Sequence, residues 1–353
     1  MLQNILGALA QLLDAASEMI LAMSYGFAAF PTALAFLVGT VGMLAFGQVN
    51  PVSIQAESII TAGTLGKDRQ ERLSIVLLSG AVMAVLGCFG ILGRLVALIG
   101  EQILAGMMAG VGILLVRAGV DFIKADAVAG GISAVSGVLV YLLTQNLIYT
   151  VCACVLLSTA AWNVVQAKKR RKSPGAGPQT IDTSHEKPER LRLKLSPRVL
   201  KGVLAMCTLQ IGSNIAYATA TGVLAGRPAN VDWVTIYCGL GNTVSAFWGG
   251  SPVGTIISAT AAATDPALCA AVFMAVMAVI LLARIIPKII RYIPSQAMAG
   301  LTFVVGVFLL FPDNAKTAFG ANPLVASATI LLSATVDPFV GMAAGVLLRY
   351  LLG

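Results

Sequence analysis

The chain has 353 residues, of which 58% are hydrophobic and only 11% are charged, and its formal net charge is +8. Soluble domains average about 25% charged residues, so this composition excludes an ordinary soluble protein. With a mean hydropathy of +0.90, it predicts an all-α polytopic membrane protein. The cations lie beside apolar spans or in one hydrophilic loop, so they indicate membrane topology and contact with the lipid bilayer rather than binding to nucleic acid.

Seven apolar segments precede residue 167. They cover about residues 2–24, 27–47, 50–65, 73–93, 98–120, 127–144 and 147–166. The third is too short to cross a bilayer as a helix, because about 15 residues reach only about 22 Å and the hydrocarbon core is about 30 Å thick. Extended backbone over part of it would close the gap, if protein or a cavity satisfies its polar groups.

A hydrophilic loop at residues 167–198 divides the chain into a first repeat, residues 1–166, and a second repeat, residues 199–353. The loop opens on five consecutive Lys and Arg and continues through a Pro- and Gly-rich stretch, so we expect a flexible solvated linker. A basic run also suits nucleic acid, but a topology signal is favoured. The second repeat has segments at about residues 199–222, 231–248, 251–264, 266–286, 295–311, 318–335 and 337–352.

Three motifs recur in the same order in both repeats. AFGQVNPVS, which contains Pro51, shares Ala, Phe, Pro and Val with AFWGGSPVG, which contains Pro252. EQILAGMMAGVGILL matches SQAMAGLTFVVGVFLL, and Ser17-Glu18 matches Ser213-Asn214. Chance similarity among Gly-rich helices is the alternative for each match alone, but three in order favour an internal repeat. With seven segments each, the repeats are inverted, and two Pro-interrupted segments in corresponding positions indicate a transporter binding site.

The distribution of Lys and Arg predicts an orientation. With fourteen segments, 19 of the 23 basic residues fall after odd-numbered segments or at their edges. The positive-inside rule then places the 167–198 loop in the cytoplasm and both termini outside, in a multi-pass protein of the cell (inner) membrane.

The motifs of common catalytic and metal sites are missing from the expected spans. The single histidine, His185, lies in the loop, and the six cysteines lie in apolar runs, where small core hydrophobes are favoured over a disulfide or metal site. We therefore predict no enzyme, no metal site and no cofactor. No ATP-binding motif occurs, so a proton or sodium gradient is the expected driving force.

Two stretches resemble the xanthine/uracil permeases, the nucleobase–cation symporters. Trp248–Thr255 (WGGSPVGT) resembles their tenth-span motif, in which a Gly-Gly-x-Pro run leads to an acidic or Gln residue followed by Asn. Ser213–Tyr217 (SNIAY) resembles their eighth-span signature, which begins with Glu, and Gln102–Leu115 is similar to their fifth span. The same architecture serves benzoate and sulfate permeases.

The resemblance implies fourteen segments in two inverted repeats of seven. Segments 3 and 10 would each be a short strand plus a half-helix, with substrate between them. The implied core domain covers about residues 1–93 and 199–286, and the implied gate domain covers about residues 98–166 and 295–353.

Two departures concern the nucleobase-binding side chains. Ser213 stands where the family has its eighth-span Glu, Ser258 stands at the tenth-span acid, and Ala259 replaces the Asn. The fold therefore transfers more readily than the nucleobase specificity. The family also usually has both termini in the cytoplasm, contrary to the charge distribution.

Three carboxylates fall within expected spans, where each is a functional candidate because ionised groups are costly in a bilayer. Asp14 and Glu18 are spaced i, i+4 and share a helix face, and Glu57 follows the first Pro break. By the repeat offset, Glu57 maps onto Ser258, and Glu18 maps onto Asn214. We predict that Glu57, Glu18 and Asp14 couple transport to protons or a cation. The alternatives place Asp14 and Glu18 at the membrane edge and Glu57 in the solvated turn that follows its segment.

Neutral polar groups around the two breaks are the predicted substrate ligands. They are Asn50, Ser53, Ser213, Asn214, Tyr217, Ser251, Pro252, Thr255 and Ser258. The alternative for the hydroxyls is close helix packing. No Lys or Arg lies centrally in a core span, so only helix N-termini at the breaks would attract an anion.

The predicted function is secondary active transport of a small-molecule substrate by ion-coupled alternating access. A nucleobase or related heterocycle is the predicted substrate, and the alternative is another small organic molecule, anion or cation on the same fold. A non-transporting membrane scaffold or receptor is the alternative of another class, against which the two intact breaks argue. A homodimer is the candidate assembly.

Overall fold

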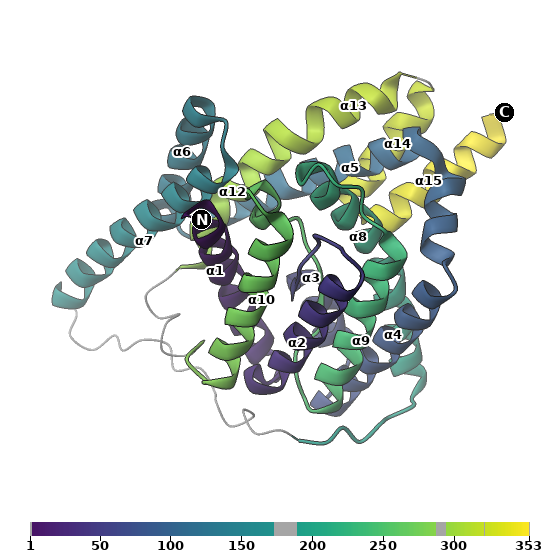
Figure 1. Cartoon of the computed structure of the whole chain (residues 1–353), viewed down its shortest axis with the longest axis horizontal. Helices are drawn as coiled ribbons and strands as arrows, with labels where there is room; N and C mark the ends of the chain where they lie inside the picture. Colours follow the sequence, from purple (N-terminus) through teal and green to yellow (C-terminus); the bar gives the residue numbers. More distant parts are fainter. Residues whose placement is uncertain (1, 173–188, 287–293, 321, 353) are drawn as a thin grey trace.

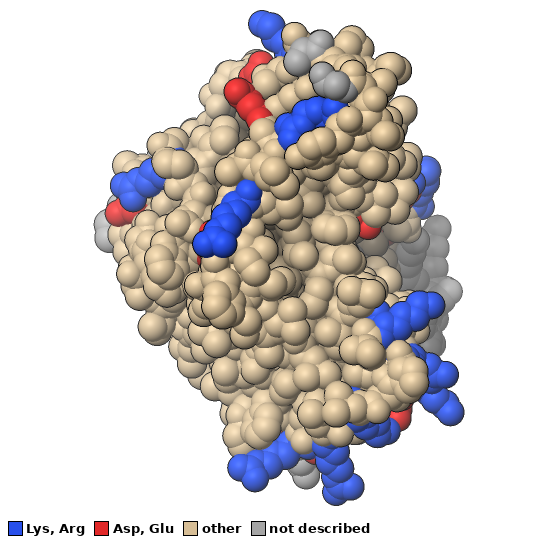
Figure 2. All heavy atoms as spheres, turned by 90° about the vertical axis from the view of Figure 1, so that its right-hand side faces the viewer, with Lys and Arg blue, Asp and Glu red and all other residues tan. Residues whose placement is uncertain are grey.

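The computed structural model describes residues 2–172, 189–286, 294–320 and 322–352. These residues form helices and one pair of short strands. Six of the described helices are long and apolar enough to cross a membrane. Figure 2 shows a face that is mostly uncharged, with many of its Lys and Arg at the lower end. The chain is therefore a multi-pass membrane protein, as predicted.

The first half contains α1 (Leu2–Ser24), α2 (Ala29–Ala45), β1 (Val52–Ile54), α3 (Ala56–Leu65), α4 (Arg69–Cys88), α5 (Ile91–Ala125), α6 (Ala127–Thr144) and α7 (Leu147–Lys172). The expected spans 2–24 and 127–144 coincide with α1 and α6. Helix α4 begins four residues earlier than expected because Asp68 accepts the Glu71 N–H as its N-cap. Gly100, at φ 73° and ψ 171°, breaks α5 into two helical pieces.

The second half contains α8 (Pro197–Leu224), α9 (Val231–Phe247), β2 (Val253–Thr255), η1 (Ala259–Ala262), α10 (Pro266–Leu282), η3 (Ser295–Met298), α12 (Ala299–Val304), η4 (Val305–Leu310), α13 (Phe311–Phe319), α14 (Pro323–Thr335) and α15 (Pro338–Leu352). The expected end at residue 311 is wrong, because α12, the π-helical η4 and α13 run on to Phe319. Pro312 falls in the first turn of α13, directly after the π-helical turns of η4.

The third and tenth segments differ in their helical part. The third is a strand followed by the ten-residue α3, as predicted. In the tenth, β2 is followed only by η1, a 3-10 helix of four residues, so the expected half-helix is reduced to one turn. Asp265 caps α10 and Pro266 starts it, and Ser258 caps η1 through the Thr260 N–H. Too few residues are left between these caps for an α-helix.

The two strands pair antiparallel with a register centred on Ser53 and Gly254. The offset that carries Pro51 onto Pro252 also carries Ser53 onto Gly254, which is its own pairing partner. It carries Val52 onto Val253, and Val253 pairs with Ile54. The repeat offset and the register therefore share one centre, as expected for two halves related by a pseudo-twofold axis in the membrane plane.

The helices pack in two groups (Figure 1). The first group comprises α2–α4 and α8–α10, seen mostly in the lower half of the view, and the second comprises α5–α7 and α12–α15. Helix α1 contacts α10 and α3 of the first group and α7 of the second. The strand pair belongs with the first group, through its contacts with α2, α8 and α9.

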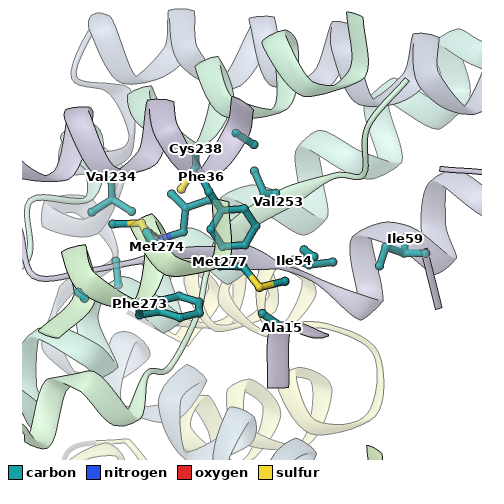
Figure 3. Packing of buried hydrophobic residues seen from close by; sticks show 14 of the residues in the cluster. Ala15, Phe36, Ile54, Ile59, Val234, Cys238, Val253, Phe273, Met274 and Met277 are labelled. Carbon is teal, nitrogen blue, oxygen red and sulfur yellow. Dashed lines mark hydrogen bonds between the residues drawn. The ribbon is translucent and has the colours of Figure 1, made fainter. Parts of the chain in front are cut away.

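One side of the strand pair rests on an apolar core (Figure 3). Ile54 and Val253, partners across the strands, are fully buried among side chains of α2 and α10. Phe36 and Phe273 meet edge to face with centroids 6.0 Å apart, and the Val52 N–H points at the Met274 sulfur at 3.2 Å. This apolar core therefore holds both Pro-interrupted segments in position.

The end of the hydrophilic loop is docked rather than free. We call residues 189–196 the strap. Within it, the Leu191 N–H donates to the Phe247 carbonyl at 3.0 Å, and the Lys194 N–H donates to Ser74 Oγ at 3.0 Å. Glu189 forms an ion pair with Arg69. The expectation of a flexible solvated linker is thus wrong for the strap, because α4 and the end of α9 accept hydrogen bonds from its backbone N–H groups. Residues 173–188, with His185, lie outside the described residues.

Acidification is expected to loosen the strap. The hydrogen bond from Lys194 is the main cause that lowers the pKa of Asp68, followed by the Glu71 N–H. The ion pair of Asp68 and Lys194 therefore stabilises the docked strap at pH values above the pKa of a free Asp, about 3.9. Its contribution is lost as the pH falls through the lower pKa of Asp68 in the folded state. The effect is small because both side chains are exposed. Hydrogen exchange at the Lys194 amide, corrected for its intrinsic rate, should accelerate below about pH 4. Asp68→Asn should already show that faster rate at neutral pH, whereas equal rates in both proteins would contradict a role for the pair.

Candidate substrate and ion site

A carboxylate from another helix lies near the N-terminus of α3. The N-cap residue, Gln55, gives no side-chain cap to α3, because its amide donates to the Thr255 carbonyl at 2.6 Å and accepts from Ser58 at 3.0 Å. The Glu18 carboxylate, on α1, lies close to the Ala56 N–H at this terminus. A negative charge at this position is stabilised by the helix dipole.

Glu57 lies in the first turn of α3 and is anchored by α8. Its carboxylate accepts a hydrogen bond from the Tyr217 hydroxyl at 2.8 Å. This contact contradicts the alternative that Glu57 belongs to the solvated turn. The charges of Asp14, Glu18 and Glu57 lie close enough to interact, so the structure brings the three predicted ion-coupling residues together.

Helix α1 also reaches the second break, through a residue that sequence reasoning missed. The Gln11 amide donates to Asp14 at 2.8 Å. Its carbonyl oxygen accepts from the Ser258 hydroxyl at 3.1 Å and from the Ala259 N–H at 3.4 Å. Gln11 lies three residues before Asp14, on the same face of α1, and that spacing was the available signal.

Several buried polar atoms on the strand pair and just before it have no partner among the described residues. They include Asn50 Oδ1, Ser53 Oγ and Thr255 Oγ1, although Asn50 Nδ2 donates to the Ala218 carbonyl at 2.9 Å. Buried polar groups normally find a partner in protein or water. These three atoms are therefore available to a water molecule or a solute.

The remaining predicted substrate ligands make contacts within the protein. Asn214 donates to Thr235 at 3.2 Å, which ties α8 to α9. The Ser213 hydroxyl donates to a carbonyl of its own helix. The Ser251 hydroxyl donates to the Pro252 carbonyl at 3.2 Å and holds the turn before β2. A binding role for these four residues stays a prediction.

Among the described residues, no cationic side chain forms an ion pair with the carboxylates at the α3 terminus. The ion pairs within the described residues involve Arg69, Lys124, Lys194 and Arg198, and none includes Glu18 or Glu57. In the same residues, no three Asp, Glu, His or Cys side chains are grouped to hold a metal ion. The site therefore offers carboxylates, hydroxyls and one helix N-terminus.

Comparisons with known proteins place this geometry in a family. The sequence profile of the sulfate permease family matches residues 7–158 and 140–324. The transmembrane domain of the cyanobacterial bicarbonate transporter BicA aligns with a TM-score of 0.60 at 15% identity, over 96% of each chain. The murine Slc26a9 anion transporter, in the inward-facing state, aligns with a TM-score of 0.60 at 15% identity, over 100% of this chain and 68% of that chain. No curated protein matches.

At 15% identity, the structural likeness establishes the fold alone. The profile match corrects the expected family: it does not support the nucleobase permeases, although the sulfate permeases share their architecture of inverted seven-segment repeats. It favours the alternative substrate expectation, an anion, over a nucleobase. Because the profile covers most of the chain, this multi-pass membrane protein belongs to the sulfate permease family and is a permease rather than an enzyme.

Proposed function

We propose that this permease moves a small anion together with protons, and that the anion binds at the N-terminus of α3. The observation that carries the proposal is the closeness of the Glu18 carboxylate to the Ala56 N–H, at a helix N-terminus whose dipole favours negative charge. The family match supports an anion as substrate. The names of the aligned structures, a bicarbonate transporter and an anion transporter, agree with it.

Proton coupling follows from the charges at this terminus. Two like charges about 4 Å apart repel by about 4 kcal/mol in a partly polar environment, so an anion would bind poorly beside an ionised Glu18 and Glu57. A proton taken up by the cluster removes one negative charge and allows the anion to enter. Because the three carboxylates interact, the proton belongs to the cluster rather than to one residue.

Alternating access would use the two helix groups. In this proposal the core, about residues 1–93 and 199–286, moves against the gate, about residues 98–166 and 295–353. The carboxylate cluster lies on α1 and α3, and α1 contacts both groups. Protonation of the carboxylate cluster can therefore influence how the core and the gate pack against each other.

The alternative substrates and assemblies differ in their support. The eighth-span Glu of the nucleobase permeases is replaced by Ser213, and the family match adds nothing in favour of a nucleobase. A sodium ion is the alternative coupling ion. Location in the cell (inner) membrane, a cytoplasmic 167–198 loop and a homodimer stay predictions.

The test is uptake by the purified full chain in proteoliposomes. Vesicles with an acidic exterior would receive formate, bicarbonate, chloride, nitrate or sulfate in turn, with uracil as the comparison. We expect accumulation of at least one anion that collapses when a protonophore is added. Uptake of uracil alone, or anion uptake that depends on sodium and ignores the protonophore, would contradict the proposal.

A further inference from the structure

The strap is docked, yet it leaves apolar side chains uncovered. Its sequence alternates three cations with three leucines: Arg190, Leu191, Arg192, Leu193, Lys194 and Leu195. The Arg192 and Lys194 N–H groups donate to side chains of α4 at 2.9 and 3.0 Å. Leu193 nevertheless stays 51% exposed and Leu195 stays 77% exposed. A segment whose backbone is held while its leucines stay open has a second surface to cover.

The exposed leucines continue onto a lipid-facing side of α8. Leu200 and Leu204, four residues apart on one face of that helix, are 71% and 67% exposed. Because α8 is long and apolar enough to cross a membrane, open leucines on its flank face acyl chains. The other end of the strap lies on Trp248, whose carbonyl accepts the Glu189 N–H at 3.3 Å, and Trp gathers where a membrane meets water. The strap therefore lies at the level of the headgroups.

Positive charge is concentrated around the docked strap. We call residues 67–72, at the start of α4, together with residues 189–201 the strap surface. It holds eight Lys and Arg but only three Asp and Glu, an excess of five positive charges. Each acid is already paired with a cation of the same surface: Asp68 with Lys194, Glu71 with Arg198 and Glu189 with Arg69. Within the described residues, Arg192 and Lys201 have no ion-pair partner. The strap runs along the lower edge of Figure 1, and Lys and Arg project from the lower end of Figure 2.

We propose that the strap surface docks on the headgroups of an anionic phospholipid leaflet. Lipid phosphates accept hydrogen bonds from Arg192 and Lys201, while Leu193 and Leu195 rest against the acyl chains. A leaflet supplies both chemistries side by side, at the level that the exposed flank of α8 already reaches. The inference goes beyond transport itself and does not depend on which anion is carried.

Anionic lipid is expected to favour the docked strap. Five excess positive charges on one surface repel one another, and undocking carries the cations of the strap away from the rest. Anionic headgroups remove that repulsion, and each basic side chain near such a leaflet is held about fivefold more strongly. The docked strap also holds the turn before β2, since the Leu191 N–H donates to the Phe247 carbonyl at 3.0 Å. Lipid charge is thereby linked to the second Pro-interrupted segment.

Hydrogen exchange in lipid nanodiscs tests the proposal. The full chain would be placed, as a single molecule per disc, in phosphatidylcholine alone and in equal parts of phosphatidylcholine and phosphatidylglycerol. Exchange at the Leu191 and Lys194 amides, corrected for intrinsic rates, should be about fivefold slower in the discs with phosphatidylglycerol. At about 1 M salt, where the Debye length is about 3 Å, the rates in the two discs should converge.

Two sets of variants separate local charge from general charge. Arg192→Gln combined with Lys201→Gln should lose most of the lipid dependence, because both cations lack an ion-pair partner within the described residues. Arg227→Gln is the matched control, since it removes an exposed cation just beyond the other end of α8. It should keep the wild-type difference between the discs. Inorganic phosphate added to phosphatidylcholine discs should not slow exchange, because it offers the leucines no acyl chains.

The outcomes that would overturn the proposal are distinct. They are equal exchange in both discs, faster exchange with phosphatidylglycerol, and loss of lipid dependence in Arg227→Gln to the same extent as in the double variant. Protection that appears only when a disc holds two chains would assign the exposed leucines to a contact between copies and would equally overturn it. None of these results bears on anion accumulation, so the proposed function stands or falls separately.

Discussion

Replacing Glu57 with Gln is expected to lower proton-driven anion accumulation by about a hundredfold, the scale at which loss of a required proton-transfer group lowers a rate. Gln retains a carbonyl oxygen that can accept the Tyr217 hydroxyl, now at 2.8 Å from the carboxylate, so the fold should be preserved. What is lost is a proton-binding group in the first turn of α3. The measurement is initial uptake into proteoliposomes under an inward proton gradient.

Two further variants isolate the coupling role of Glu57. Anion exchange without a gradient should continue in Glu57→Gln, because exchange needs binding and movement but no net proton transfer. Tyr217→Phe should lower uptake while keeping its dependence on the proton gradient, since it removes the hydroxyl that anchors Glu57 and leaves the carboxylate in place. Unchanged gradient-driven uptake in Glu57→Gln would rule out a coupling role for Glu57 within the cluster, with Glu101→Gln, which removes an exposed carboxylate of α5, as the control.

Gly80→Leu on α4 is expected to have the largest effect on stability. A Cβ at Gly80 would lie 2.7 Å from the Asn242 Cβ and 2.7 Å from the Gly239 carbonyl, at the contact between α4 and α9. Both atoms belong to α9, so a side chain fits only if the helices separate. Overpacking of this kind costs about 1–3 kcal/mol or more. Thermal denaturation in detergent should show a clearly lower midpoint.

The same change should also impair transport, because α9 holds the second strand. Asn242 Oδ1 accepts the Val253 N–H at 2.6 Å, so displacement of α9 shifts β2. Gly131→Leu on α6 is the matched control, since nothing lies within 4 Å of a Cβ at that position. It should leave stability and uptake close to those of the wild type. Equal midpoints for the two variants would contradict the tight α4–α9 contact.

Sequence patterns predicted those features that depend on local chemistry. The short segment around Pro51 could not span a bilayer as a helix, and it forms a strand followed by α3. The i, i+4 spacing of Asp14 and Glu18 placed both on one face of α1, and the structure brings them near Glu57. Helical periodicity and the length that a segment can span are properties of a single element, so they can be predicted before the fold is known.

Contacts between distant segments could not be predicted in the same way. Gln11 caps the second break across 248 positions, and no local pattern encodes that approach. The strap has the composition of a linker, but its backbone docks on Ser74 and Phe247. The expectation of a nucleobase substrate failed for a related reason. A shared fold preserves the two Pro-interrupted segments, whereas substrate specificity depends on individual side chains. Ser213, for example, stands where the nucleobase permeases have a Glu.

The pairing of β1 with β2 has a consequence for biosynthesis. Ser53 and Gly254 pair directly, but translation at about 5–20 residues per second separates their synthesis by roughly 10 to 40 seconds. Throughout that interval β1 has no partner strand for its N–H and C=O groups, and lipid offers none. We expect a nascent intermediate in which β1 stays near water or a chaperone, so a stalled or truncated chain would expose the strand that the finished protein buries.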